Sequence, residues 1–360
     1  MKASYFGRTA AVMAAGALAL TACGGGGDGG SDGDVSGTLT GAGASSQEAA
    51  MTSWIDGVKG QHSNLDVRYS PDGSGAGRQA FLAGGANFAG SDAVMSDDEY
   101  ESSKEVCGPD GAFHIPVYIS PIAVTFNLEG VDSLNLDAET LAMIFSGEIT
   151  TWDDPQIAEQ NDGVELPSTD ITVVHRSDES GTTENFTEYL HAVAPDVWTD
   201  EAAESWPVSG QENAQGTNGV VSTVQSTDGA ITYADSSATL GMTSANIKVG
   251  DEYVELSSEA AAKAVEASHT IEGRSENEMA MELDRTTTEA GAYPIVLVSY
   301  HIFCNQYEDQ ETADLAQAFG KYVVSEDGQN TANEAAGSAP LSESLREQAD
   351  QAFDNISAAS

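Results

Sequence analysis

Residues 171–183 read Ile-Thr-Val-Val-His-Arg-Ser-Asp-Glu-Ser-Gly-Thr-Thr and contain the unit from which the fold class follows. The first five residues are rich in β-branched side chains, which is typical of a buried strand. Phe186, Tyr189, Leu190 and Val193 then follow at helical spacing. The stretch therefore predicts a strand and a helix joined by a turn of hydroxyl, glycine and charged residues, which is the repeating unit of an α/β fold.

Two further turns have a similar composition and also lie before a helix. Residues 43–46 (Gly-Ala-Ser-Ser) precede apolar side chains at helical spacing in 51–58, and residues 73–77 (Gly-Ser-Gly-Ala-Gly) lie between a β-prone 67–69 and a helical 79–82. Strands that alternate with helices indicate mainly parallel pairing. At roughly 150 residues per domain, a chain of 360 residues predicts two domains.

Other segments continue this alternation. We expect strands at 88–92, 115–126, 231–233 and 295–300, the second of them interrupted by Pro116 and Pro121. A helix is expected around 141–145, and two helices close the chain, one around 315–322 and one starting near Pro340.

The three turns share one chemistry. Free backbone N–H groups and the positive end of the helix dipole meet where a helix begins, so such turns bind anions without a positively charged protein. Glycine permits close backbone approach, and hydroxyls such as those of Ser45, Ser46, Ser74, Ser180 and Thr182 add donors. One such turn alone is better explained as a simple helix cap. Three together favour a common oxyanion site at the carboxyl ends of the strands.

Charged residues beside these turns refine this hypothesis. Arg176 offers a planar donor fork to an oxyanion, and Asp178 is placed to hold that fork, although a surface salt bridge is the alternative. Asp92 is unexpected, because a carboxylate repels an anion unless the anion has a proton to donate. Phosphate near neutral pH carries such a proton and sulfate does not, so Asp92 favours phosphate over sulfate.

The charge excludes several classes of partner. The chain has 13 basic and 58 acidic residues, a net charge of −45, which argues against nucleic-acid binding and against attraction to anionic lipid. An anionic ligand is still allowed, because salt screens surface charges beyond about 8 Å whereas donors inside a cleft act at close range. The acidic surface then serves solubility or suits a saline exterior.

The first residues have the pattern of an export signal. Lys2 and Arg8 precede an apolar stretch at 10–20, which is shorter than the about 20 residues that a membrane-spanning helix needs. Residues 20–23, Leu-Thr-Ala-Cys, resemble a bacterial lipobox. We therefore expect a signal peptide at 1–22, and at 23–37 a lipidated Cys23 with a flexible Gly/Asp/Ser tether. An ordinary signal peptide with an incidental cysteine is the alternative.

The remaining cysteines, Cys107 and Cys304, are expected to pair, because export places them in an oxidising compartment. Two separate buried thiols are the alternative. The six histidines are scattered, and neither Cys-x-x-Cys nor His-Glu-x-x-His spacing occurs. The sequence therefore predicts no metal site and no cofactor.

These motifs in this order resemble the substrate-binding protein of bacterial high-affinity phosphate ABC transporters. The resemblance covers most of the chain after the tether and rests on six segments together, at 39–44, 72–76, 88–93, 147–155, 175–183 and 229–233. It implies a periplasmic-binding-protein-like α/β fold with two lobes, each a mostly parallel sheet flanked by helices, that close on one dehydrated phosphate. The lobes are expected at 38–119 plus 299–360 and at 120–298, and a Cys107–Cys304 bridge would then staple the two separated segments of the first lobe.

The resemblance also implies site residues and partners. The phosphate site carried over position by position consists of Ser45, Ser46, Ser74, Asp92, Arg176, Ser180, Gly181 and Thr182, with Asp178 orienting Arg176. Family members often have Thr-Phe where this chain has Ser45-Ser46, which leaves the backbone N–H as the group to expect at the second position. Arg78 is expected to be peripheral. The implied partners are inorganic phosphate (HPO4²⁻ or H2PO4⁻) and permease subunits, and we expect a monomer anchored by its lipid to the outer face of the cytoplasmic membrane.

Other functions fit these residues less well, and we expect that the chain is not an enzyme. An exported phosphatase or serine hydrolase would need a metal cluster or an activated nucleophile, and only Ser180 near His175 suggests one. The same fold binding another oxyanion or a phosphorylated metabolite is a second alternative. An adhesive surface lipoprotein would leave the chemistry of the three turns unexplained.

Overall fold

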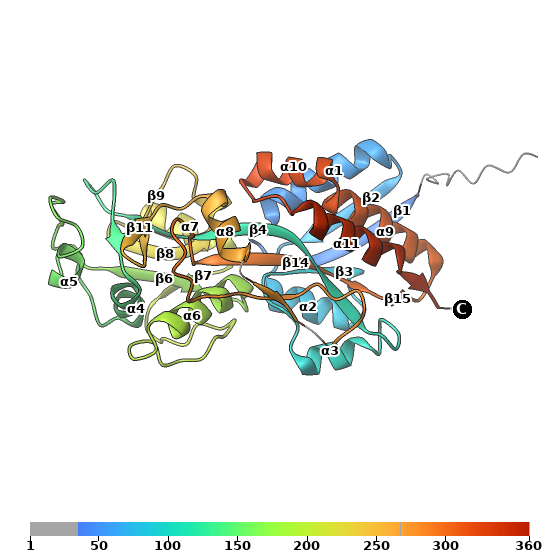
Figure 1. Cartoon of the computed structure of the whole chain (residues 1–360), viewed down its shortest axis with the longest axis horizontal. Coiled ribbons are helices and arrows are strands. Elements are labelled where there is room, and N and C mark those ends of the chain that lie inside the picture. The colour runs from blue at the N-terminus through green and yellow to red at the C-terminus, as the bar shows by residue number, and fades with distance from the viewer. Residues whose placement is uncertain (1–34, 267, 272, 360) are drawn as a thin grey trace, which may run out of the picture. The chain divides into compact units, whose positions relative to one another are not determined.

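The computed structural model describes residues 35–266, 268–271 and 273–359. A mixed sheet of nine strands runs through them (Figure 1). Its strands are β1 (Gly37–Gly43), β2 (Leu65–Ser70), β3 (Phe88–Ser91), β4 (Ala112–Asn127), β6 (Thr172–Arg176), β7 (Glu212–Ala214), β8 (Ala230–Asp235), β9 (Thr243–Ser244) and β14 (Val296–Cys304). Their order is β2-β1-β3-β14-β4-β8-β6-β7, and β9 pairs with β4.

Three smaller sheets are built from short strands. These are β5 (Asn135–Leu136), β10 (Asn246–Val249) and β11 (Glu252–Val254) in one sheet, β12 (His269–Thr270) with β13 (Met281–Glu282), and β15 (Gln306–Tyr307) with β16 (Ser357–Ala358).

Helices connect the strands and cover the sheet. They are α1 (Glu48–Gln61), α2 (Ser74–Leu82), α3 (Asp97–Ser103), α4 (Ala138–Ser146), α5 (Pro155–Ala158), α6 (Gly181–Val193), α7 (Gly216–Ser226), the 3₁₀ helix η1 (Ser236–Thr239), α8 (Ser258–Glu266), α9 (Gln310–Val324), α10 (Glu326–Ala336) and α11 (Glu343–Asp354). Figure 1 shows α1, α9, α10 and α11 beside the β1–β2 end of the sheet, and α4, α6 and α7 near β6 and β8.

The pairing is parallel at the two ends of the sheet and antiparallel at its centre. β1 is parallel to β2 and β3, and β6 is parallel to β7 and β8, as the alternation predicted. β4 and β14 are antiparallel to each other, because β4 crosses from one end of the sheet to the other and β14 returns. Residues 112–121 of β4 pair with β14, and residues 122–127 pair with β8.

Pro116 and Pro121 do not end β4, although the sequence predicted an interruption. Pro116 lies opposite Tyr300, where the register shifts between Ser299 and Tyr300, and Pro121 lies opposite Val296 at the end of the shared ladder. A proline cannot donate to a ladder and is accommodated at a bulge or a strand end. The strand stays continuous because its side chains are buried from Ala112 to Phe126.

Three helices close the chain instead of the predicted two. α9 and α11 correspond to the two predicted helices, whereas α10 was not predicted because its sequence, EDGQNTANEAA, is largely polar. α10 begins at an N-cap, Ser325, whose hydroxyl accepts from Gly328 N–H. It packs against α1, where the Trp54 indole N–H donates to Gly328 O at 2.8 Å.

The predicted signal peptide and Cys23 lie outside the described residues. β1 begins at Gly37, the last residue of the predicted tether, and Val35 packs against the core, so the folded part starts earlier than the sequence indicated. Within the described ranges, no helix combines the length and the apolar character needed to cross a bilayer.

The predicted pairing of Cys107 and Cys304 is confirmed. The two sulfurs are bonded across a sequence separation of 197 residues. Cys107 precedes β4 and Cys304 ends β14, so the bridge joins an early and a late segment of the chain at the same end of the sheet. Both cysteines are buried.

Replacing both cysteines by alanine is expected to lower the free energy of unfolding by about 4–5 kcal/mol, because a loop of this length is no longer closed in the unfolded chain. Urea titration of the oxidised protein and of Cys107→Ala/Cys304→Ala measures the difference. A loss below about 1 kcal/mol would show that the bridge does not constrain the unfolded chain.

Candidate functional site

The three turns singled out in the sequence each follow a strand and begin a helix. They join β1 to α1, β2 to α2 and β6 to α6. The ends of β1 and β3 approach so closely that a Cβ on Gly43, which has φ +146°, would lie 1.9 Å from Gly90 O. Only glycine fits there. This close approach brings the first turn next to Asp92, which follows β3.

Asp92 lies at the centre of the site and is 4% exposed. Ser46 Oγ donates to its Oδ1 at 2.6 Å, and Thr182 Oγ1 donates to its Oδ2 at 2.8 Å. Ser299 Oγ, from β14, also donates to Oδ1. A carboxylate offers about four acceptor positions, so three hydroxyls leave room for one further proton donor.

The second and third turns enclose the backbone of Asp92. The Asp92 N–H donates to Ser74 Oγ, in the first turn of α2, at 3.1 Å. Asn185 Nδ2 donates to Asp92 O at 2.7 Å from α6. A Cβ on Gly181 would lie 2.7 Å from Ala93 N, so the start of α6 packs directly against the backbone of Asp92 and Ala93. Ser180 caps α6 by accepting from Thr183 N–H at 3.2 Å.

Arg176 and Asp178 form a fork-to-carboxylate pair. Arg176 Nε donates to Asp178 Oδ1 at 2.8 Å and Nη2 to Oδ2 at 2.5 Å. Burial opposes a charge on Asp178, but the hydrogen bond and charge of Arg176 outweigh it and hold the pKa of Asp178 below its ordinary value. The pair uses two of the five guanidinium N–H groups, which leaves three for a ligand.

Asp178 of this pair lies against two glycines, one in the second turn and one at the start of α7. Asp178 Oδ2 would lie 2.7 Å from a Cβ on Gly73, the residue before Ser74. The Gly216 N–H, at the start of α7, donates to Asp178 Oδ1 at 3.0 Å. Hydrogen bonds and close approaches thus connect the three turns with Asp92 and Asp178, and Ser45, Asp92 and Arg176 are each under 10% exposed.

Sequence reasoning missed four residues at this place. Thr217, in α7, lies 3.0 Å from Ser45 Oγ through its Oγ1, and its N–H also donates to that oxygen. Gln47 Nε2 donates to Ser299 Oγ at 2.6 Å. Asn185 and Ser299 complete the set. A polar Ser299 inside an apolar strand and a Gly-Thr pair at the start of α7 were the available signals.

The hydrolase alternative named His175 and Ser180, and these two residues contact different groups. His175 stacks on Trp206 with ring centroids 5.5 Å apart, and its Nδ1 faces Arg176 O at 2.8 Å. Burial lowers the pKa of His175. In the part of the chain that the structure describes, no hydrogen bond joins His175 to Ser180, and no group of three or more His, Cys, Asp or Glu is arranged to hold a metal ion.

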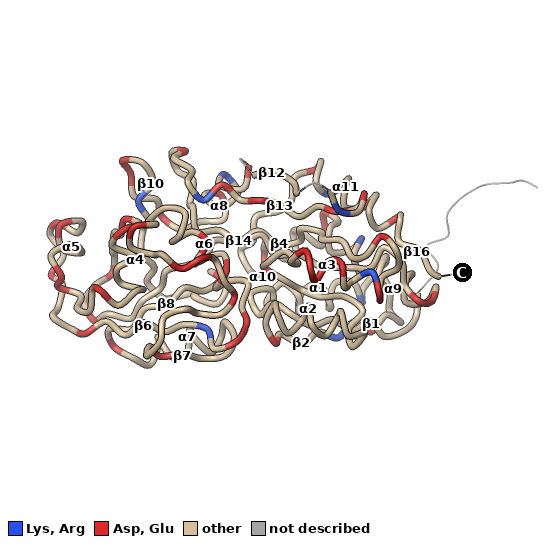
Figure 2. The backbone as a smooth tube through the Cα atoms, turned by 90° about the horizontal axis from the view of Figure 1, so that it is seen from below, with Lys and Arg blue, Asp and Glu red and all other residues tan. Residues whose placement is uncertain are grey.

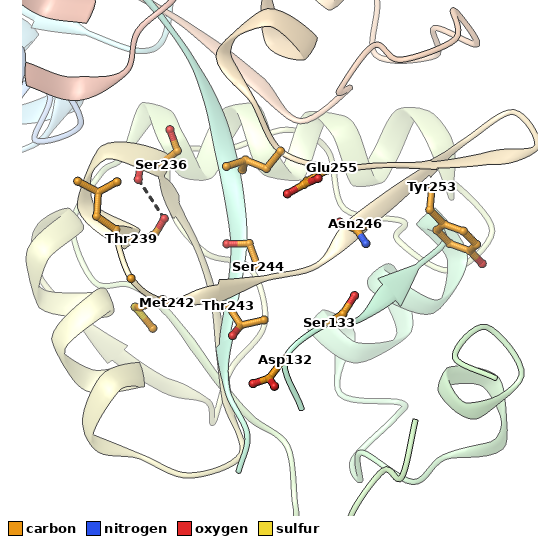
Figure 3. Close-up of a pocket in the computed structure, with 13 residues that line it drawn as sticks. Asp132, Ser133, Ser236, Thr239, Met242, Thr243, Ser244, Asn246, Tyr253 and Glu255 are labelled. Atoms are coloured by element: carbon orange, nitrogen blue, oxygen red, sulfur yellow. Dashed lines mark hydrogen bonds between the residues drawn. The ribbon is translucent and has the colours of Figure 1, made fainter. Parts of the chain in front are cut away.

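Two pockets differ in their position relative to the candidate site. The larger of the two lies apart from the three turns (Figure 3). Its volume is about 610 Å³, and its walls include Ser133, Ser236, Thr243, Tyr253 and Glu255. It shares no residue with the three turns. A smaller pocket of about 230 Å³ reaches Asp92 from the side of Glu184 and Arg285.

Glu184 is a carboxyl group beside the site whose pKa is raised. Burial, followed by the negative charge of Glu204, raises the pKa of Glu184 to about 7, although Arg78 opposes the shift. Glu184 lies in the first turn of α6, next to Thr183 and Asn185.

Comparisons with protein families and with known proteins point to the same family. A family model described as a PBP superfamily domain matches residues 29–327. The chain is 36% identical over 375 aligned positions to phosphate-binding protein PstS 2 of Mycobacterium tuberculosis, covering 99% of this chain and 100% of that protein. It is 37% identical to phosphate-binding protein PstS3 of Mycobacterium bovis, covering 89% and 90%.

Solved structures show the same fold. A high-affinity periplasmic phosphate-binding protein bound with phosphate matches with a TM-score of 0.69 at 22% identity, covering 86% of this chain and 92% of that chain. A phosphate-binding protein from Stenotrophomonas maltophilia matches with a TM-score of 0.65 at 21% identity, covering 88% and 94%. These matches confirm the expected periplasmic-binding-protein-like α/β fold.

Glu184→Gln is expected to change how stability depends on pH. The pKa of Glu184 in the folded state, about 7, exceeds its ordinary value of 4.5. Glu184 therefore lowers the free energy of unfolding, and this loss grows as pH rises from about 4.5 to about 7. The variant should therefore be more stable than the wild type by up to about 3 kcal/mol at pH 8 and by less than about 1 kcal/mol at pH 5. Urea unfolding at both pH values measures this, with Glu334→Gln on the exposed face of α10 as control. An equal difference at both pH values would contradict the assignment.

Proposed function

The chain belongs to the PstS family of phosphate-binding proteins, and on this premise we propose that it binds inorganic phosphate outside the cytoplasm and delivers it to the permease of an ABC transporter. One observation carries the proposal. A buried carboxylate, Asp92, lies among hydroxyls and helix N-termini that would otherwise suit any oxyanion.

Asp92 is the residue that selects among oxyanions. Its remaining acceptor position needs a proton from the ligand, and HPO4²⁻ and H2PO4⁻ carry one whereas sulfate does not. Arg176 supplies the ionic donor, and Ser45, Ser46, Ser74, Ser180, Gly181 and Thr182 supply hydroxyl or backbone N–H donors at helix starts. We assign phosphate contacts to these residues, with Asp178 orienting Arg176.

The net charge of −45 does not oppose this function. Figure 2 shows Asp and Glu spread along the whole described backbone, with few Lys and Arg. Charges farther than about 8 Å from the anion are screened at physiological salt. The buried donors act at contact distance in a medium of low dielectric constant, so they dominate.

We propose that the two lobes are residues 38–119 plus 299–360 and residues 120–298, joined by β4 and β14. Thr182 on Asp92 and Thr217 on Ser45 are contacts between these lobes. Residues 274–281 belong to the second range but lie against the first, since Arg274 Nη2 donates to Met95 O at 2.7 Å. Separation of the lobes would open the site to solvent, and closure would exclude water from it.

The proposed location follows from the first 37 residues. A signal peptide at 1–22, a lipid on Cys23 and a Gly-rich tether would hold the folded part, as a monomer, at the outer face of the cytoplasmic membrane. A lipid-anchored protein collects phosphate beside its permease. We propose that the protein is not an enzyme. An assay in which it releases no phosphate from p-nitrophenyl phosphate would support this.

The mature protein is expected to bind phosphate at least about 100-fold more tightly than sulfate at pH 7.5, because sulfate would leave Asp92 facing an unprotonated anion. Isothermal titration calorimetry with each anion measures the two dissociation constants. Equal affinity would refute the role of Asp92 and favour a general oxyanion site. Tight binding of a phosphorylated metabolite, without inorganic phosphate, would favour that alternative ligand.

Arg176→Ala is expected to weaken phosphate binding more than Asp92→Asn, by roughly 100-fold against roughly 10-fold, because only the first change removes an ionic donor. Arg68→Ala, which removes an exposed arginine paired with Asp66, is the control and should bind as the wild type does. Circular dichroism establishes that each variant is folded. A larger loss for Asp92→Asn would reverse the assigned order of importance.

A further inference from the structure

A largely buried ion pair lies beside the proposed phosphate site. Arg78, on α2, is 5% exposed, and Glu204 lies in the segment between α6 and β7. Arg78 Nη1 donates to Glu204 Oε1 at 2.9 Å, and Nη2 donates to Oε2 at 2.7 Å. Bidentate, charge-assisted pairs of this kind are among the strongest polar contacts in proteins.

Arg78 has almost no donor left for a ligand. Its Nε donates to Glu99 Oε1 at 3.0 Å, and Nη1 also donates to Ser91 Oγ at 2.9 Å. Together with the two bonds to Glu204, these use four of the five guanidinium N–H groups. Arg78 therefore acts by positioning other groups and does not contact the anion.

The two partners are attached to different sides of the site. α2 packs against β1 and β3. Glu204 is tied to the start of α6, because its carbonyl oxygen accepts from Ser180 N–H at 3.0 Å. A Cβ on Gly75 would lie 2.6 Å from Glu179 Oε2 and 3.2 Å from Glu204 Oε2, so glycine at this position of α2 lets both glutamates approach. The pair thus spans the proposed lobes next to the turns that hold the anion.

We propose that Arg78 and Glu204 form a latch that holds the two lobes closed over the bound anion and thereby sets its dissociation rate; this inference rests on the proposed function. When the lobes separate, Glu204 returns to water while Arg78 keeps Glu99 and Ser91. The latch therefore stabilises only the closed state, and a larger closed fraction lowers the apparent dissociation constant.

Ser91 connects the latch to the site. Its Oγ donates to Ala93 O at 2.6 Å, accepts from Ala93 N–H at 3.2 Å, and accepts from Arg78. These contacts fix the turn that presents Asp92. Arg78 therefore supports the central carboxylate from one lobe and grips the other lobe through Glu204.

The test compares Glu204→Gln with Glu201→Gln, a matched change at an exposed position of the same segment. Phosphate release from each protein is followed by stopped-flow fluorescence of a phosphate sensor. Glu204→Gln should release phosphate about 10-fold faster or more, because a neutral amide loses the charge-assisted pair. The association rate and the phosphate-to-sulfate ratio should stay within about twofold of the wild type, because the latch does not touch the ligand.

Arg78→Lys is the second variant, since it keeps the charge but loses the planar fork. It should release phosphate faster than the wild type, and the double variant should show less than the product of the two single effects. Release from Glu204→Gln at the rate of Glu201→Gln would overturn the latch. A change in the phosphate-to-sulfate ratio would also overturn it, because it would show contact with the ligand.

Failure of the proposed function has a different signature. If the wild-type protein binds no phosphate in calorimetry, the function fails, and the latch is judged by small-angle X-ray scattering without ligand. A larger radius of gyration for Glu204→Gln than for Glu201→Gln would then support the latch, and identical values would overturn it.

Discussion

The buried Asp92 carboxylate must be surrounded by hydrogen-bond donors, and much of the architecture serves this requirement. Burying a carboxylate without partners destabilises the folded state by several kcal/mol. The fold must therefore supply hydrogen-bond donors around it. Here hydroxyls reach it from the start of α1, the start of α6 and the centre of β14. These segments are far apart in the sequence, and only a sheet whose central strands connect its two ends brings them to one place.

The local parts of this arrangement could be predicted from the sequence, because a strand, a Ser/Gly turn and a helix are adjacent in the chain. The turns at 43–46, 73–77 and 180–183 were therefore found. Ser299 and Thr217 were not, because their part in the site depends on the pairing of β14 and the placement of α7, which no local pattern specifies. α10 was missed for another reason: packing on α1 and a serine cap stabilise a helix whose sequence is largely polar.

Three carboxylates at the site each have their own partner, which explains how a strongly acidic protein can offer a site for an anion. Asp178 faces Arg176, Glu204 faces Arg78, and Asp92 faces three hydroxyls. Two of the chain's 13 basic residues are thus buried where they are matched to carboxylates. Charges farther than about 8 Å from the site are screened at physiological salt. Net charge therefore describes the surface, while the site is governed by contacts within a few ångströms.

The polar walls of the site also affect how easily it can open again to release its ligand. Apart from the Arg78–Glu204 latch, the walls that meet around Asp92 touch through hydroxyls, backbone groups and glycines. Apolar walls would gain about 25 cal/mol for each Å² buried and would favour a closed site even without a ligand. Polar walls exchange their contacts for water at a small net cost, since a protein hydrogen bond contributes only about 1 kcal/mol over its hydrated partners. A site built in this way can close on its ligand and still release it, which a protein that delivers its ligand to a permease requires.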